Sequence, residues 1–110
     1  MTERELLTRA AEAAGLQIEY WALEWAQEDY PVVRVGDNKH GWNPLKVNSD
    51  ALALAVRMEM DVFVRGGRWT EAVAPMGPAC QEPHLGDALA ATRRAITRAA
   101  AAVRIKAPNG

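Results

Sequence analysis

Cysteine is nearly absent from this chain of 110 residues: Cys80 stands alone, so no disulfide can form within the chain. A single cysteine fits a reducing compartment. No apolar run approaches the ~20 residues that a membrane-spanning helix needs, and the first residues are followed by no apolar stretch of the kind found in secretory signals. The formal net charge is only −1, whereas general nucleic-acid binders are usually strongly basic. We therefore expect a protein that is neither secreted nor membrane-bound, and for which nucleic-acid binding is the lesser alternative.

Motifs that carry chemistry are equally scarce. Gly66 and Gly67 are not followed by Lys and Ser or Thr, so they form no phosphate-binding loop. Cys80 and His84 are spaced like metal ligands, but a structural zinc ion needs four ligands, and His40 is the only further histidine. A nucleophilic cysteine needs a base and an oxyanion site, and the segment around Cys80 indicates neither. We therefore expect no catalytic residue, no metal site and no cofactor, and hence a protein that is not an enzyme.

The length and the composition predict a single domain. Hydrophobic residues make up 49% of the chain and charged residues 25%, which is an ordinary globular balance. A chain of this size can bury about two thirds of the surface that its unfolded form exposes. We expect the domain to cover residues 1–106 and residues 107–110 to form a frayed tail, because these last residues have nothing to pack against.

Three helices are predicted, over Thr2–Ala14, Asp50–Met58 and Asp87–Lys106. Thr2 and Glu5 have the spacing of a capping box, and Asp87 is a good N-cap. Helical periodicity predicts buried stripes on the second and third helices. The stripe of the second helix is Ala51, Leu52, Leu54, Ala55 and Met58. That of the third is Leu89, Ile96, Ala99, Ala100 and Val103.

Alternating apolar residues predict four strands. They are Gln17–Leu23, Pro31–Val35, Met60–Arg65 and Arg68–Ala74, the last two joined by a two-residue turn at Gly66-Gly67. Residues 20–28 stay open between strand and short helix, because Trp21 and Trp25 also have helical spacing. Residues 76–86 are predicted to be an irregular connection. The order is α-β-β-α-β-β-α, which predicts an α+β domain with a mainly antiparallel sheet covered by helices.

Three segments together resemble a family of small proteins from phages and prophages. They are Trp42-Asn43-Pro44-Leu45, the helix Asp50-Ala51-Leu52-Ala53-Leu54-Ala55-Val56, and the helix Ala91-Thr92-Arg93-Arg94-Ala95-Ile96. The nearest named group is the phage α-β-α sandwich family. The resemblance implies a helix–sheet–helix layered fold, a bacterial-virus origin and no catalytic residues. Together with the single cysteine and the lack of a secretory or membrane-spanning segment, this origin leads us to expect a protein of the bacterial host's cytoplasm.

Trp42 and Pro44 admit two interpretations. They could form the lip of a ligand- or peptide-binding site. Alternatively, Trp42 packs against the second helix and anchors its start, since a buried tryptophan removes ~150–250 Å² from water. We favour the structural interpretation, because an aromatic residue beside a proline turn usually serves packing.

An acidic and aromatic segment, residues 19–30, is the first candidate binding surface. It holds four acids and four aromatic residues and no base. Such a surface suits a protein partner with a basic, hydrophobic patch. The alternative is that Tyr20 and one tryptophan are core residues and the acids form a solvated sheet edge. The candidate binding residues here are Tyr20, Trp21, Glu24 and Trp25.

An arginine-rich face of the last helix is the second candidate. From Asp87 to Lys106 the chain holds five bases and one acid, and Arg94 and Arg98 are the candidate binding residues. This face could contact phosphates in a nucleic acid. It could also be solvated, or paired with acids of the first helix such as Glu12.

The sequence thus predicts a small accessory protein of phage or prophage origin that has no enzymatic activity. We expect it to act by binding an unidentified protein partner or by self-association, and inhibition of a host defence system is one such role. The alternative function is a nucleic-acid-binding module that uses Arg93, Arg94, Arg98 and Arg104.

Overall fold

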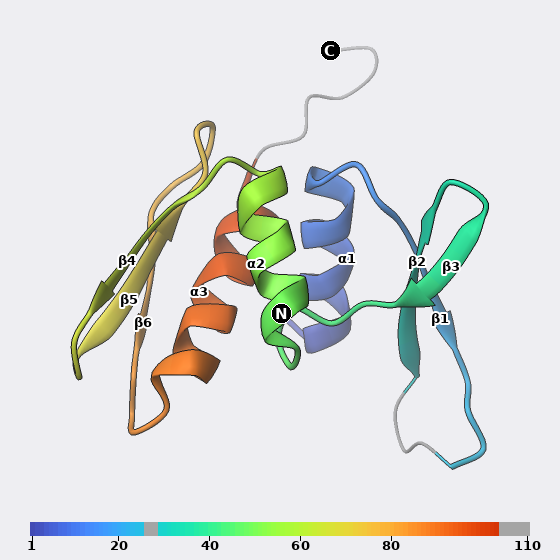
Figure 1. Cartoon of the computed structure of the whole chain (residues 1–110), viewed down its shortest axis with the longest axis horizontal. Helices are drawn as coiled ribbons and strands as arrows, with labels where there is room; N and C mark the ends of the chain where they lie inside the picture. Colours follow the sequence, from blue (N-terminus) through green and yellow to red (C-terminus); the bar gives the residue numbers. More distant parts are fainter. Residues whose placement is uncertain (26–28, 104–110) are drawn as a thin grey trace.

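The computed structural model describes residues 1–25 and 29–103, and these form the α+β fold that the sequence predicts (Figure 1). In the described part of the chain the element order is α-β-β-β-α-β-β-β-α. Three helices form a central layer, and a three-stranded antiparallel sheet lies on either side of it (Figure 1). The expected single sheet covered by helices is therefore two small sheets with the helices between them. The layers thus also differ from the helix–sheet–helix order that the phage resemblance implies.

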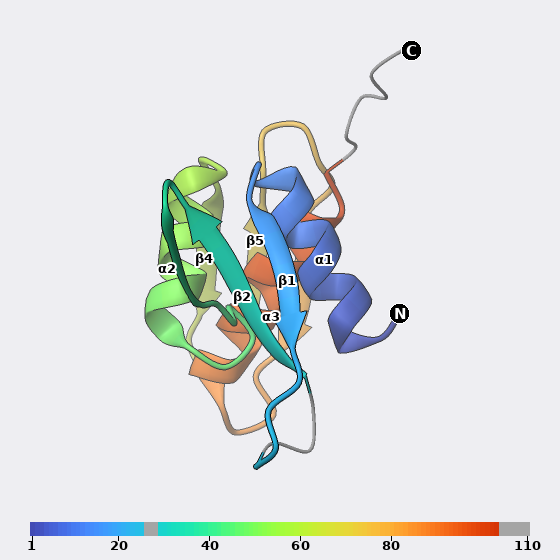
Figure 2. The same ribbon diagram turned by 90° about the vertical axis from the view of Figure 1, so that its right-hand side faces the viewer.

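The first sheet contains β1 (Gln17–Trp21), β2 (Tyr30–Val35) and β3 (Asn38–Gly41), with β2 in the centre. Figure 2 shows this sheet in front of the helical layer. The sequence prediction missed β3, because its four residues carry no apolar alternation. The strand forms because Val35 pairs with Asn38 across the two-residue turn Gly36-Asp37, in which Gly36 has a positive φ of 62°. The open choice for residues 20–28 is settled as strand for Tyr20 and Trp21, while residues 22–25 are neither strand nor helix, so the predicted strand to Leu23 ends two residues early. Residues 26–28 lie outside the described ranges.

The second sheet contains β4 (Asp61–Arg65), β5 (Trp69–Val73) and β6 (Cys80–Pro83), with β5 in the centre. The hairpin turn between β4 and β5 has three residues, 66–68, rather than two. The expectation of an irregular connection over residues 76–86 is wrong for residues 80–83, because β6 pairs with β5. The sequence does not predict β6, because Cys-Gln-Glu-Pro lacks strand-forming residues. The strand forms because it pairs with β5.

Helices α1 (Glu3–Ala13) and α3 (Ala88–Ala101) begin at the predicted caps. The Thr2 hydroxyl accepts a hydrogen bond from the Glu5 amide at 3.1 Å, and the Asp87 carboxylate accepts one from the Ala90 amide at 3.0 Å. Each cap satisfies an amide that has no partner within the helix. The last helix ends at Ala101, so its predicted extension toward Lys106 is wrong for residues 102–103. Residues 104–106 and the predicted tail over residues 107–110 lie outside the described residues.

Helix α2 (Asn48–Arg57) begins two residues earlier than predicted, and Asp50 lies in its first turn. The Asp50 carboxylate accepts a hydrogen bond from the Asn43 amide at 2.9 Å and holds the preceding turn. Trp42 is 6% exposed and belongs to the hydrophobic core, and Pro44 is also fully buried. The structural interpretation of Trp42 is therefore confirmed.

The core between the helices is built largely from alanine, which lets the helix backbones approach closely. Ala10, Ala11, Ala95 and Ala99 are completely buried, and α1 and α3 make the most extensive helix–helix contact. Leu54 and Ile96 provide larger side chains to this core.

Two leucines predicted to be buried are exposed. Leu52 is 65% exposed, because it lies on the side of α2 that no other described element covers. Leu89 is 62% exposed, because it stands in the first turn of α3, ahead of the core cluster, which begins along this helix at Ala95. No helix within the described ranges combines the length and the apolar character needed to cross a membrane.

Candidate binding surfaces

The first candidate surface is the end of the first sheet at which β1 stops and β2 starts. Trp21 pairs with Tyr30 across these strands, so both side chains project from the same face of the sheet. This face points away from the helices, because the neighbouring Ile18 and Tyr20 face them. Each of the two rings is 43% exposed, and Trp25, just beyond β1, is 81% exposed. We call Trp21, Trp25 and Tyr30 the aromatic end.

Val32 and Gly41, an apolar and a small residue of the first sheet, support the rings of Trp21 and Tyr30. Val32 shares the outer face with Trp21 and Tyr30 and is 2% exposed, although it lies outside the core cluster between the helices. The Tyr30 ring lies directly over Gly41 of β3, where any side chain would collide with it. The two rings on the strands, Trp21 and Tyr30, therefore stand on a preformed platform, which favours binding because little ordering entropy is lost.

Tyr20 is anchored to α1 and is not part of this exposed surface. Its hydroxyl lies 2.8 Å from the Thr8 hydroxyl and donates to the Arg4 carbonyl at 3.0 Å. The Arg4 guanidinium lies over the Tyr20 ring, 4.2 Å from its centre. Of the four candidate residues in this segment, Trp21, Glu24 and Trp25 are each exposed, and Tyr20 fixes β1 to α1.

Basic residues of the chain neutralise two of the acids near the aromatic end. Lys39 of β3 lies 2.7 Å from the Glu19 carboxylate, and its hydrogen bond lowers the pKa of Glu19. The same ammonium group lies 5.8 Å from the centre of the Trp21 ring. Arg4 pairs with Asp29 at 2.7 Å. Cations of the chain thus already contact an aromatic ring and two acids at this surface, namely Trp21, Glu19 and Asp29.

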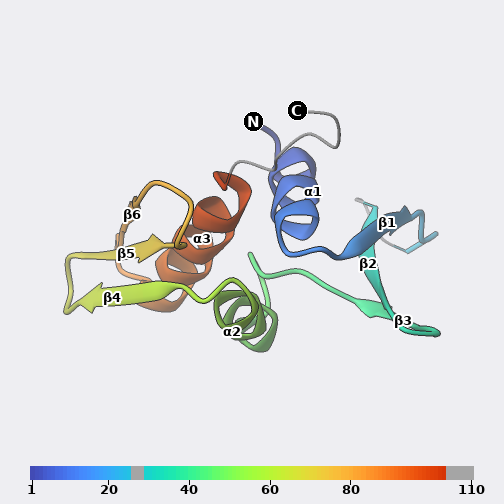
Figure 3. The ribbon, with the colours of Figure 1, turned by 90° about the horizontal axis from the view of Figure 1, so that it is seen from above.

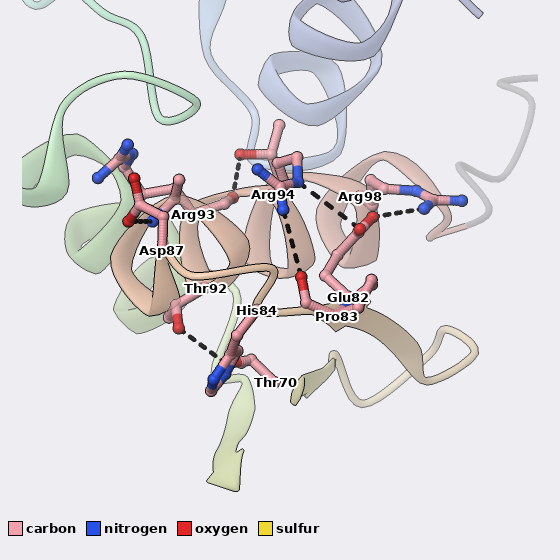
Figure 4. A network of polar contacts seen from close by, with 11 residues as sticks. Thr70, Glu82, Pro83, His84, Asp87, Thr92, Arg93, Arg94 and Arg98 are labelled. Carbon is pink, nitrogen blue, oxygen red and sulfur yellow. Dashed lines mark hydrogen bonds and ion pairs between the residues drawn. The ribbon is translucent and has the colours of Figure 1, made fainter. Parts of the chain in front are cut away.

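The second candidate surface, the arginine face of α3, is engaged by β6 (Figure 4). Glu82 is 8% exposed and accepts from Arg98 at 2.5 Å, with the Arg94 Nε at 3.6 Å. The hydrogen bond to Glu82 raises the pKa of Arg98. The expected partner of these arginines, an acid of α1 such as Glu12, is thus replaced by Glu82, whose strand the sequence prediction missed. A phosphate group at this face must compete with Glu82.

Arg93 also has partners within the fold. Its Nε donates to the Leu45 carbonyl at 2.9 Å, and Nη1 donates to the Asn48 side chain at 2.6 Å. It thereby fixes the start of α2 against α3. Arg104 lies outside the described residues. The candidate residues Arg94 and Arg98 lie beside the second sheet, and α1 separates them from the aromatic end (Figure 1).

A buried polar cluster lies beside the arginines, and sequence reasoning missed it (Figure 4). The Thr70 hydroxyl lies 2.9 Å from His84 Nε2 and 2.9 Å from the Thr92 hydroxyl. His84 is 3% exposed, and its Nδ1 has no hydrogen-bond partner. Cys80 lies on β6, where burial raises the pKa of its thiol. Among the described residues, no group of three or more potential ligands could hold a metal ion.

A groove with a volume of about 640 Å³ lies between α2 and the helix-facing side of β2 and β3. We call it the α2 groove. Its walls are mostly apolar, and Trp42 and Leu54 connect it to the core. The residues that line it are Leu16, Val33, Val35, His40, Trp42, Ser49, Asp50, Leu52, Ala53, Leu54, Val56 and Arg57. The sequence signal for the α2 groove is that α2 carries apolar residues on all sides, whereas periodicity predicts only one buried stripe.

Comparisons of the chain with protein-family models, with curated proteins and with solved structures find no match. Evidence for the function of the chain therefore comes from its surfaces.

Proposed function

We propose that this is a non-enzymatic binding protein, an accessory protein of phage or prophage origin, that recognises a protein partner through the aromatic end. The observation that carries the proposal is the exposure of three aromatic rings at and just beyond the end of β1: Trp25 at 81%, and Trp21 and Tyr30 at 43% each. Tryptophan and tyrosine dominate the energetics of protein interfaces. Leaving three such rings in water costs hydrophobic free energy that a partner would recover.

The charges around the aromatic end define the chemistry of the partner. Glu24 is exposed next to Trp25 in the chain, whereas Glu19 and Asp29 are already paired with Lys39 and Arg4. The Trp21 ring already has the Lys39 ammonium group nearby. A partner segment with arginine or lysine next to apolar side chains would match this surface, with its cation over Trp25. A host-defence protein with such a segment is one form of this partner.

The experiment is a selection of binding peptides from a displayed random library. We expect the selected peptides to combine basic and apolar residues. The double variant Trp21→Ser/Trp25→Ser should bind them at least tenfold more weakly, because each exposed aromatic anchor contributes on the order of 1–2 kcal/mol. Met76→Ser is the matched control, since Met76 is an equally exposed apolar side chain, at 82%, outside the aromatic end. Unchanged binding by the double variant would refute the proposal.

Nucleic-acid binding is tested with the same protein. Labelled DNA and RNA oligonucleotides at low salt should give no mobility shift, because Glu82 engages Arg94 and Arg98. A salt-sensitive shift that is lost on Arg94→Gln would favour the nucleic-acid alternative instead.

A further inference from the structure

Helix α2 carries a second apolar stripe that nothing described in the chain covers. The stripe consists of Leu52, Ala53 and Val56, with the polar Ser49 at its start; these positions follow the spacing i, i+3, i+4, i+7, so they lie on one face of the helix. Leu52 is 65% exposed and Val56 is 70% exposed. The opposite face, with Ala51, Leu54 and Ala55, is buried in the core. A helix that is apolar on both faces is normally buried on both.

The exposed stripe lies at an accessible place in the fold. Seen from above, α2 lies at the outer edge of the helical layer, between the two sheets (Figure 3). The same stripe forms one wall of the α2 groove, and Val35 of β2, 51% exposed, belongs to the opposite wall. The groove therefore offers apolar side chains on both walls to an incoming helix.

The charged residues of α2 have a pattern that is complementary to itself. Asp50 and Arg57 both line the α2 groove, seven residues apart and on one flank of the exposed stripe. Hydrogen bonds fix both charged groups. The Asp50 carboxylate accepts a hydrogen bond from the Asn43 amide, and the Arg57 Nε donates one to the Ala14 carbonyl at 2.5 Å. The acid lies near the start of the helix and the base near its end. An antiparallel copy of the same helix would place opposite charges together at both ends.

We infer that the α2 groove binds helix α2 of a second copy of this chain, in a two-fold symmetric dimer whose α2 helices are antiparallel. A two-fold interface requires that residue i meets residue j and residue j meets residue i. The midpoint of the charged pair, Asp50 and Arg57, lies between residues 53 and 54. The midpoint of the apolar pair, Leu52 and Val56, lies at residue 54. The two midpoints differ by half a residue, about 0.75 Å along the helix. One symmetry axis therefore satisfies both the charged and the apolar pairs, a coincidence that an unrelated partner does not require.

The first test is sedimentation equilibrium of the whole chain over a range of concentrations. Because a single short helix buries less than the ~800 Å² per partner of a standard interface, we expect a dissociation constant on the order of 10 µM. Leu52→Glu should weaken the dimer at least thirtyfold without affecting the thermal unfolding of the monomer, since Leu52 is largely exposed. Trp25→Ser should leave the dimer unchanged, which separates this inference from the proposed function. A wild-type chain that stays monomeric at 1 mM, or a Leu52→Glu chain that dimerises normally, would overturn it.

The second test uses the symmetry of the charges. Asp50→Lys and Arg57→Glu should each dimerise poorly alone, because each places like charges together at both ends. An equal mixture of the two variants should form a heterodimer as tight as the wild-type dimer, since Lys at 50 then meets Glu at 57 and Arg57 meets Asp50. This recovery cannot come from a folding defect, because the same chains are present in both experiments. Failure of the mixture to recover, with both variants folded by circular dichroism, contradicts the antiparallel arrangement.

Discussion

Removing the charge of Glu82 should destabilise the fold more than removing any exposed acid. Glu82 is 8% exposed, and its carboxylate holds Arg94 and Arg98 of α3 against β6. Glu82→Gln keeps the shape of the side chain but turns an amide toward two cations. Breaking a buried ion pair costs about 3–5 kcal/mol, and an exposed one contributes about 0–1 kcal/mol.

The magnitude for Glu82→Gln lies between these limits, because the side chains of Arg94 and Arg98 are 38% and 54% exposed. We expect the free energy of unfolding to fall by about 2 kcal/mol, since solvent screens the two cations but not the carboxylate. For a chain of this size, the melting temperature should fall by about 8 °C. Calorimetry and urea unfolding measure both quantities.

The control for this prediction is Glu12→Gln, the same substitution at an acid of α1. Glu12 is exposed, and we expect its loss to change stability by less than about 0.5 kcal/mol. If Glu82→Gln lowers the melting temperature by less than 2 °C, or if Glu12→Gln lowers it as much, the assignment of Glu82 as the anchor of α3 is refuted.

Three further predictions concern other parts of the fold. Leu54→Ala should lower the free energy of unfolding by about 3 kcal/mol in urea, because Leu54 is 2% exposed in the core; a loss below 1 kcal/mol would contradict the packing described. Thr70→Val should cost about 2 kcal/mol in the same assay, because it leaves His84 and a threonine of α3 without their hydrogen bonds. A Val variant as stable as the wild type would show that the cluster contributes nothing. The pKa of Glu19, followed by NMR, should lie below its ordinary 4.5, so its stabilising contribution is present above that pH and is lost as the pH falls through the lowered pKa. Lys39→Met should raise this pKa toward the ordinary value, and an unchanged titration would count against the ion pair.

Local signals in the sequence predicted local structure well. The caps Thr2 and Asp87 are confirmed because each acts on an amide only three residues away. The burial of Trp42 was predictable because a proline turn fixes its position beside α2. The α+β class followed from the alternation of helical and strand periodicities.

Non-local structure was not accessible in the same way. Strands β3 and β6 exist through their pairing with β2 and β5, and their own residues carry no strand signal. Without β6, the partner of the arginines could only be sought on α1. The exposure of Leu52 was missed because periodicity shows that a helix is apolar, but not which neighbours cover it.

The aromatic end was found by sequence composition, but its geometry was not. The segment predicted that aromatic and acidic residues gather there. Only the pairing register shows that Tyr20 faces α1 while Trp21 and Tyr30 share the outer face. A strand shifted by one residue would reverse these roles.

The central claim, recognition of a partner through the aromatic end, is tested most directly by NMR of the four tryptophan indole N–H groups. The chain has four tryptophans, and they report on three surfaces: Trp21 and Trp25 on the aromatic end, Trp42 on the α2 groove, and Trp69 on the second sheet. Titration with a selected basic, apolar peptide should shift the signals of Trp21 and Trp25 and leave those of Trp42 and Trp69 in place. Shifts confined to Trp42 or Trp69, with Trp21 and Trp25 unmoved, would contradict the account.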